Sequence, residues 1–242
     1  MKSIEITIPV LNEEETLHSQ VTKVLDFFNS IHHDEYDFSL VIADNGSTDQ
    51  TRNIASRLAE ANDSKLRLVE VDQRGVGLAL QKSWNTSQAD IVGYMDLDLA
   101  TDISHLNDVI EIYSNRNVDI VYGTRLHQNS KVIGRTFKRE VTSRVFNFIL
   151  KTYLSSKFSD GMCGFKFFKR ENIEPLLNNG VKSGGWFFCT EVLVVGEKLN
   201  FKMAELPVKW TDDENSKVKI LSLSLEYLKA MRRLKKCINT SA

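Results

Sequence analysis

Residues 91–98 carry the sequence Ile91-Val-Gly-Tyr-Met-Asp96-Leu-Asp98, in which a short apolar run ends directly at two carboxylates. The run has the length and apolar content of a buried strand. Two carboxylates spaced in this way can bind a hard cation such as Mg²⁺ or Mn²⁺ from one side, leaving its other positions to phosphate and water oxygens. The alternative is a solvated acidic loop, and the Asp-x-Asp pattern alone does not decide between the two.

The segments on either side repeat an alternation of apolar strand, polar turn and helix. Strands are predicted over residues 4–10, 38–43, 66–71 and 119–123, and helices begin after each of the polar turns. This alternation predicts a parallel, doubly wound α/β sheet. Because ligands bind beyond the carboxyl ends of parallel strands, the polar residues after the strands should meet at one edge. They are Asn12, Glu13, Asp44, Asn45, Arg74, Gly75, Asp96 and Asp98.

The second half of the chain has a different pattern. Residues 141–154 predict a helix with an apolar face, and residues 160–168 are punctuated by glycine and then aromatic. Residues 181–197 and 201–210 predict a helix and a strand, and residues 217–237 an amphipathic helix ending in basic residues. Those basic residues either contact anionic lipid or complement the helix dipole.

The composition of the 242 residues, 42% hydrophobic and 26% charged, is typical of one large globular domain. A net charge of −1 argues against nucleic-acid binding. The three cysteines, which lack CxxC or zinc spacing, indicate reduced thiols in the cytosol. The first residues turn acidic too soon for a signal peptide, and no run reaches the roughly 20 apolar residues of a membrane span. We therefore expect a protein without a transmembrane anchor of its own.

Other motifs narrow the chemistry. The sequence has no GxxxxGK[ST] loop, no HExxH and no nucleophile elbow. Gly75-x-Gly77 permits a close backbone approach but lacks the third glycine of a dinucleotide fingerprint. Asp44 is either a nucleoside-binding acceptor or part of an Asx turn, and both roles can hold at once. One basic cluster either holds phosphates or forms a solvated helix face: Lys131, Arg135, Lys138, Arg139 and Arg144.

Together these segments resemble family 2 glycosyltransferases of the GT-A fold, a mostly parallel sheet flanked by helices, here with amphipathic helices in the C-terminal part. Within that family they are most similar to polyprenyl-phosphate sugar transferases. The Asp160 and Trp210 segments resemble the dolichyl-phosphate glucosyltransferase branch in particular. The matching segments cover nearly the whole chain in order: Pro9-Val-Leu-Asn-Glu13, Asp44-Asn-Gly-Ser-Thr-Asp-Gln-Thr51, Gly75-x-Gly77-x-Ala79, Asp96-Leu-Asp98, Gly123-Thr-Arg125, Asp160-Gly-Met-Cys-Gly-Phe-Lys166, Trp186-Phe-Phe-Cys-Thr-Glu191 and Trp210-Thr…Ser216-Lys217.

The resemblance implies a catalytic domain over residues 1–212 and a basic amphipathic helix over 213–242. Within the domain, residues 1–125 would hold the nucleotide-sugar and residues 126–212 the acceptor. It also implies the role of each matching residue. The nucleotide would be held by Pro9, Asn12, Glu13, Asp44, Gly75 and Asp96, and the metal by Asp96 and Asp98, with Asp98 the more direct ligand. Asp160, Glu191 and Arg125 would act at the reaction centre, and Arg139, Ser143 and Lys217 on the acceptor phosphate.

The implied reaction is an inverting transfer of a hexose from a nucleotide-sugar to a polyprenyl or dolichyl phosphate, assisted by Mg²⁺ or Mn²⁺. An acceptor phosphate with a second pKa of about 6 is already largely an anion at neutral pH, so Asp160 would orient the sugar. With a hydroxyl acceptor, Asp160 would be the base. Three departures favour UDP-glucose over GDP-mannose: Asn45 in place of a second acid, Ala100 in place of a metal-binding glutamine, and Asp213 with Asn215 in place of an arginine and a glycine.

We expect a role in cell envelope glycosylation, in the cytoplasm or peripheral on the cytoplasmic face of a membrane. The expected partners are a UDP- or GDP-hexose, a polyprenyl phosphate, and a membrane surface or a membrane partner protein. Two alternatives stay open. One is a glycosyltransferase acting on a hydroxyl of a glycan or protein, and the other is a catalytically silent nucleotide-sugar-binding subunit.

Overall fold

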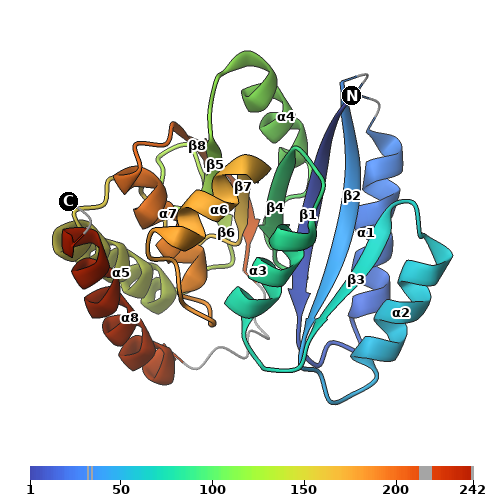
Figure 1. Cartoon of the computed structure of the whole chain (residues 1–242), viewed down its shortest axis with the longest axis horizontal. Helices are drawn as coiled ribbons and strands as arrows, with labels where there is room; N and C mark the ends of the chain where they lie inside the picture. The colour runs from blue at the N-terminus through green and yellow to red at the C-terminus, as the bar shows by residue number, and fades with distance from the viewer. Residues whose placement is uncertain (32, 34, 213–219, 241–242) are drawn as a thin grey trace.

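The centre of the molecule is a seven-stranded sheet with the order β3-β2-β1-β4-β7-β5-β8 (Figure 1). The computed structural model describes residues 1–31, 33, 35–212 and 220–240. β1 to β4 are mutually parallel, as the alternation of strands and helices predicted. The strands are β1 (Lys2–Val10), β2 (Tyr36–Asn45), β3 (Leu66–Val71), β4 (Ile91–Met95), β5 (Ile120–Thr124), β7 (Phe165–Lys169) and β8 (Met203–Pro207), with β6 (Lys131–Ile133) and β9 (Lys209–Thr211) paired separately.

β7 is the strand of the seven-stranded sheet that the sequence pattern did not predict. It comes from the glycine-punctuated aromatic segment and lies between β4 and β5, antiparallel to both. Phe167 packs into one hydrophobic core and Phe168 into the other, so the strand is apolar on both faces and shows no alternation. Met95 pairs with Phe165, which brings the loop before β7 beside the carboxyl end of β4.

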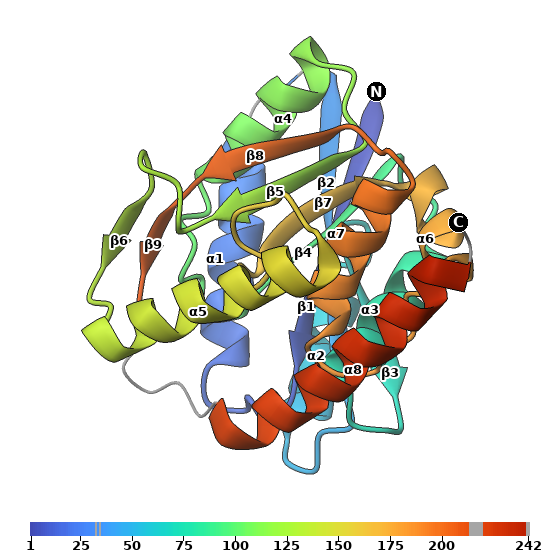
Figure 2. The same cartoon turned by 90° about the vertical axis from the view of Figure 1, so that its left-hand side faces the viewer.

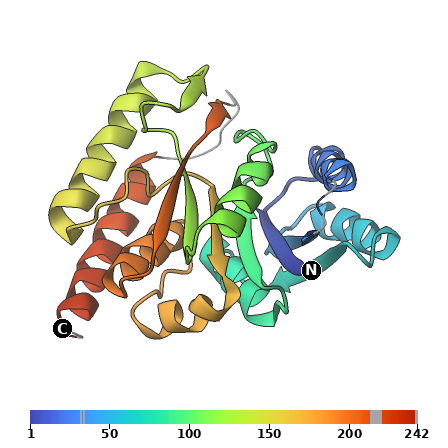
Figure 3. The same cartoon turned by 90° about the horizontal axis from the view of Figure 1, so that it is seen from above.

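Helices cover both faces of the sheet. α1 (Leu17–Ser30), α2 (Thr51–Ala61) and α4 (His105–Asn115) pack against one face, and α3 (Val76–Thr86), α6 (Ile173–Asn178) and α7 (Phe188–Lys198) against the other. A short 3-10 turn, Arg170–Asn172, precedes α6. α5 (Phe137–Leu154) and α8 (Ile220–Thr240) lie side by side on one flank of the molecule (Figures 2 and 3). Among the described helices, none has the length and apolar character needed to cross a bilayer.

Three predicted boundaries were wrong for identifiable reasons. α5 begins at Phe137 rather than 141, because the Thr136 side chain caps it by accepting from the Arg139 N–H. α7 begins at Phe188 rather than 181, since the segment before it packs against α3. The strand predicted over 201–210 is split into β8 and β9 at Val208, whose N–H bonds to the carbonyl of Thr124 in β5. The predicted helix start at 217–219 lies outside the described residues.

Candidate active site

The carboxyl ends of β1, β2 and β4 meet where the strand order changes direction, the usual ligand position in open α/β sheets. Asn45 ties two loops to the end of β2. Its amide donates to the Val10 carbonyl at 3.1 Å, and its Oδ1 accepts from the Gly75 N–H at 3.0 Å. Asn12, with a φ of 54°, accepts from the Thr48 N–H at 2.8 Å. The expected convergence of polar loops is therefore present and is built from hydrogen bonds between them.

We expect Asn45→Asp to lower the thermal midpoint, because a carboxylate cannot donate to the Val10 carbonyl and would face it as a second acceptor. Leaving a buried polar group unsatisfied costs about 1–3 kcal/mol. For a chain of this size that corresponds to roughly 2–4 °C per kcal/mol in a thermal melt. The matched control is Asn107→Asp on the exposed surface of α4, which should leave the midpoint unchanged. Equal midpoints for both variants would contradict the assigned role of Asn45.

Other residues assigned to the nucleotide have local structural contacts. Pro9 is buried within β1, and the Glu13 N–H donates to the Thr51 hydroxyl at 2.7 Å. A Cβ on Gly75 would lie 2.5 Å from the Gly184 carbonyl oxygen, so glycine lets α3 approach the segment before α7. These contacts shape the edge of the sheet, and direct nucleotide binding by these residues stays a prediction.

Asp44 has, within the described chain, an unpaired carboxylate oxygen at the end of β2. The carboxylate is fully buried, and its Oδ2 accepts from Arg52 Nη2 at 3.1 Å and from the Ser47 N–H at 3.3 Å. Its Oδ1 is buried and has no hydrogen-bond donor in the part of the chain that the structure describes. A ligand N–H or hydroxyl would satisfy that oxygen. Asp44 therefore makes the turn contact expected from the sequence, and its second oxygen has no donor among the described residues, while nucleoside binding by Asp44 stays a prediction.

Asp96 and Asp98 follow β4 in a turn closed by a 3.3 Å bond from the Leu99 N–H to the Asp96 carbonyl. Asp98 is exposed and accepts from the Ala100 N–H at 3.0 Å. The Asp96 Oδ1 atom is buried, and no described residue donates to it. Burial, and then the neighbouring Asp98 charge, raises the pKa of Asp96 to about 7.

This pair of carboxylates fits a divalent cation. A bound cation would offset both the desolvation of Asp96 and its repulsion from Asp98. No group of three or more His, Cys, Asp or Glu side chains with metal-binding geometry occurs among the described residues. Mg²⁺ or Mn²⁺ held here would therefore take its remaining oxygens from substrate and water.

The loop before β7 closes the site from the other side. A Cβ on Gly164 would lie 1.9 Å from Asp96 Oδ2, so only glycine lets the loop pass the carboxylate. Lys166 is fully buried, and the sequence resemblance gave it no role. Its ammonium donates to the Tyr94 hydroxyl at 3.0 Å and to the Cys163 carbonyl. Burial lowers the pKa of Lys166, while its positive charge favours the ionised form of Asp96. Lys166 thus anchors the loop and adds positive charge behind the carboxylates.

Arg125 and Asp160 form a buried ion pair beside this loop. Arg125 Nε lies 2.8 Å from Asp160 Oδ2 and Nη2 lies 3.1 Å from Oδ1. The N–H groups of Arg125 and Met162 donate to the same carboxylate at 3.2 and 3.0 Å. Burial by itself raises the pKa of Asp160, but the guanidinium and these hydrogen bonds hold it at about 2. Asp160 is therefore an anion near neutral pH and a weak proton acceptor.

Trp210 on β9 lies between two arginines. Its ring centroid is 5.3 Å from the guanidinium carbon of Arg125 and 5.8 Å from that of Arg135, both within cation–π range. Burial, and then the charge of Arg125, lowers the pKa of Arg135. The ring therefore connects the Asp160 ion pair to the basic residues at the start of α5.

Two of the three predicted acceptor-phosphate residues lie at this end of α5. The Ser143 hydroxyl accepts from Arg135, and Arg139 pairs with Asp212. The third, Lys217, lies outside the described residues, together with the departures at 213 and 215. The basic cluster therefore has two parts. Arg135 and Arg139 are held in these contacts, and the other three members are exposed on the surface, namely Lys131, Lys138 and Arg144.

Glu191 on α7 is fully buried and holds the segment before that helix. Its Oε2 accepts from the N–H groups of Lys182 and Ser183 at 3.0 and 2.7 Å, and its Oε1 accepts from Arg233 of α8. These are the contacts of a residue that positions the loop and α8. A direct role at the reaction centre stays a prediction.

Asn147 is a site-supporting residue that the sequence reasoning missed. Its buried side chain accepts from the Gly161 N–H at 2.9 Å and so holds the residue next to Asp160. The available signal was a single amide on the otherwise apolar, inward face of α5, where a buried polar group requires a partner.

Known proteins of similar sequence match most of this chain. The family model described as "Glycosyl transferase family 2" matches residues 5–177. The chain is 34% identical over 219 residues to "Glycosyltransferase AglD" from Haloferax volcanii, covering 90% of this chain and 34% of that protein. It is 28% identical over 241 residues to "Dolichyl-phosphate beta-glucosyltransferase" from Dictyostelium discoideum, covering 96% of this chain and 73% of that protein. The chain therefore spans about a third of the first relative and about three quarters of the second.

The fold also occurs in solved structures. Glucosyl-3-phosphoglycerate synthase from Mycobacterium tuberculosis, crystallised with Mn²⁺, UDP and glucosyl-3-phosphoglycerate, superposes with a TM-score of 0.68 at 18% identity, covering 98% of this chain and 80% of that one. This likeness establishes the GT-A arrangement predicted from the sequence. The family model covers well over half of the residues, from β1 through α6. The chain belongs to glycosyl transferase family 2.

Proposed function

We propose that the chain is a metal-dependent hexosyltransferase that moves a sugar from a nucleotide-sugar to a polyprenyl or dolichyl phosphate. The observation that carries the choice of acceptor is the buried Arg125–Asp160 pair, because a carboxylate with a pKa of about 2 is a weak base at neutral pH. A lipid phosphate needs no base, since it is largely ionised above its second pKa of about 6. The names of the dolichyl-phosphate glucosyltransferase relatives support the same acceptor.

In this proposal residues 1–125 hold the donor. Asp44 Oδ1 accepts a hydrogen bond from the nucleoside, and Asp96 with Asp98 hold Mg²⁺ or Mn²⁺. When bound, the cation would neutralise charge that develops on the leaving diphosphate. UDP-glucose is favoured over GDP-mannose because of the sequence departures at Asn45, Ala100 and the 213–215 segment.

Residues 126–212 receive the acceptor. Arg139 and Ser143 bind its phosphate, and Arg135 holds the Ser143 hydroxyl in place. Asp160, fixed by Arg125, orients the sugar so that the phosphate oxygen attacks its anomeric carbon from the face opposite the diphosphate, which inverts the configuration. Positioning and electrostatics then supply most of the rate.

The direct test is transfer of radiolabelled sugar by the purified chain. We expect label from UDP-glucose, more than from GDP-mannose, to move into polyprenyl phosphate in the presence of Mn²⁺ and not with EDTA. Label appearing only in a glycan or protein hydroxyl would replace the proposed acceptor. Nucleotide-sugar binding without transfer or hydrolysis would instead identify a silent binding subunit.

The pH dependence of transfer should follow the acceptor. At saturating metal, we expect kcat/KM to rise with pH and level off above the second pKa of the lipid phosphate, about 6. A phosphonate analogue of the acceptor, which ionises at higher pH, should move the midpoint upward by the difference in the two acceptor pKa values. Because the pKa of Asp160 is about 2, its ionisation adds no step in this range. A midpoint that does not change with the acceptor would argue for an enzyme base and against the proposal.

A further inference from the structure

The outward face of α5 carries an apolar stripe. Five side chains spaced three or four residues apart along the helix, or adjacent to such a position, share this face, as expected for one side of an α-helix. The opposite side of α5 packs inward through Leu150 and Leu154. The stripe consists of Phe137, Val141, Val145, Phe148 and Ile149, which are 83%, 41%, 52%, 66% and 37% exposed. Contiguous exposed apolar surface rimmed by polar residues usually marks an interaction site.

The exposed charges along the stripe are basic. Lys138, Arg144 and Lys151 are exposed on α5. Glu140, the acidic residue of this helix, is paired with Arg135 and Arg144. An apolar stripe flanked by lysine and arginine is the pattern of a helix that lies in the interface of an anionic membrane.

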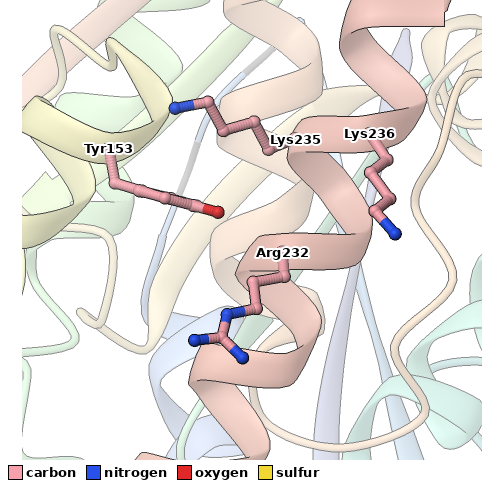
Figure 4. A pocket seen from close by; sticks show the side chains of 4 residues that line it. All are labelled: Tyr153, Arg232, Lys235 and Lys236. Atoms are coloured by element: carbon pink, nitrogen blue, oxygen red, sulfur yellow. The ribbon is translucent and has the colours of Figure 1, made fainter.

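α8 extends this surface. The ring of Phe146 in α5 packs at a tilt of 50° against that of Tyr227 with the centroids 5.4 Å apart, and the Lys235 ammonium lies 4.1 Å from the Tyr153 ring centroid. Residue numbers increase in the same direction from the first contact to the second on both helices, so α5 and α8 run parallel (Figure 2). Between them is an open crevice of about 370 Å³ lined by one aromatic and three basic side chains (Figure 4), Tyr153, Arg232, Lys235 and Lys236.

The dipole of α8 does not account for these basic residues. The helix continues to Thr240, and its last turn contains no basic residue. Favourable charge–dipole interactions are confined to the last turn. The basic residues of α8 therefore lie too far from the helix end to complement its dipole, and three of them share the surface of the α5–α8 crevice.

Charge is strongly polarised across the molecule. α5 and α8 together contain nine basic and two acidic residues, a net charge of +7. Since the whole chain has a net charge of −1, the remainder carries −8. Two copies of a surface with this charge would repel each other, so a second copy of the chain is a poor occupant, whereas an anionic lipid surface is complementary.

We propose that the α5 stripe and the α5–α8 crevice form a membrane-docking face that binds the surface of an anionic bilayer. The stripe enters between the headgroups, and the crevice side chains contact lipid phosphates. This inference goes beyond the proposed function and uses none of the residues assigned to donor, metal or acceptor.

Vesicle co-sedimentation of the whole chain tests the proposal. We expect binding to phosphatidylcholine vesicles containing phosphatidylglycerol to be at least about tenfold stronger than to phosphatidylcholine alone. Phe137→Ser/Phe148→Ser should weaken that binding at least about tenfold, and Phe137→Leu/Phe148→Leu should retain it. The proposal would be overturned if wild type bound both kinds of vesicle equally, or if the serine variant bound as strongly as wild type.

The crevice has a matched charge control. Arg232→Gln/Lys235→Gln should weaken binding at least about tenfold at low salt, with the difference shrinking as salt is added. Lys23→Gln/Arg57→Gln removes the same charge from exposed positions of α1 and α2 on the opposite side of the molecule (Figure 1) and should leave binding unchanged. Equal losses from the two pairs would mean that overall charge, and not this face, attracts the membrane.

Two further measurements separate the other outcomes. In one outcome, wild type does not bind vesicles but is a dimer in light scattering, and Phe137→Ser/Phe148→Ser is a monomer. That result would overturn the proposal and identify the face as an interface between copies of the chain. Transfer to a short, water-soluble isoprenyl phosphate should be unchanged in the docking variants. Failure of wild type in that assay, with vesicle binding intact, would count against the proposed function and leave the docking face standing.

Discussion

Asp98→Ala should reduce hexose transfer at least about a thousandfold while the protein remains folded. Asp98 is exposed and accepts a hydrogen bond from the Ala100 N–H, and losing a bond of this kind costs about 1–3 kcal/mol, so we expect the variant to remain folded. Without Asp98, one carboxylate remains for the metal, and charge on the departing diphosphate loses most of its stabilisation. Radiolabelled transfer measured over a Mn²⁺ titration gives the expected loss directly.

Nucleotide binding makes this test specific for the metal. In EDTA, Asp98→Ala and wild type should bind UDP equally, whereas Mn²⁺ should strengthen binding only in wild type. Asp102→Ala is the matched control, because Asp102 lies on the same segment but pairs with Lys209 and Ser104. Undiminished turnover of Asp98→Ala at saturating Mn²⁺ would exclude the metal role assigned to this residue.

Arg125→Met should destabilise the protein and abolish transfer together. The substitution leaves the fully buried Asp160 carboxylate without its cation, and breaking a buried ion pair in this way costs about 3–5 kcal/mol. A thermal midpoint lower by on the order of 10 °C is expected for a chain of this size. Urea unfolding and the transfer assay measure the two effects separately.

A double variant and a pH series separate the fold from the chemistry. Arg125→Met/Asp160→Asn removes both charges and keeps an acceptor for the Met162 N–H, so it should recover most of the stability without activity. In wild type the pKa of Asp160 is lowered from 3.8 to about 2, so its stabilising contribution is full above pH about 4 and is lost as pH falls toward 2. In Arg125→Met, burial raises the pKa of Asp160, and stability should instead increase as the pH falls. The same pH response in both proteins would refute this assignment.

Local pattern predicted the elements of the fold well where each element has one buried face. The strand–turn–helix alternation of residues 4–123 located β1 to β5 and placed Asp44 and Asp96 at the same edge of the sheet. β7 was not predicted because its aromatic side chains are buried on both sides, and its place between β4 and β5 depends on contacts far away in sequence. The split of residues 201–210 at Val208 likewise depends on a bond to β5.

The site residues, like the strands, were predictable only where the signal is local in sequence. Residue type and strand-end position predicted Asp44, Asp96 and Asp98 as site residues, because a carboxylate at the carboxyl end of a buried parallel strand lies at the edge where ligands bind. The residues that hold the surrounding loops in place could not be predicted in this way. Asn147 holds Gly161, Lys166 reaches Tyr94 and Trp210 stacks beside Arg125, and each of these pairs joins residues that no local periodicity relates.

The position of β7 also determines when the sheet can form as the chain is synthesised. When a ribosome has released only residues 1–125, β4 has one open edge and β5 lacks both of its neighbours in the finished sheet. Unpaired edges of this kind are prone to aggregation until a partner strand arrives. We therefore expect residues 1–125 not to fold stably by themselves. A nascent chain must emerge at least through Lys169 before its sheet can close, and a fragment ending at Arg125 should be recovered mainly in inclusion bodies.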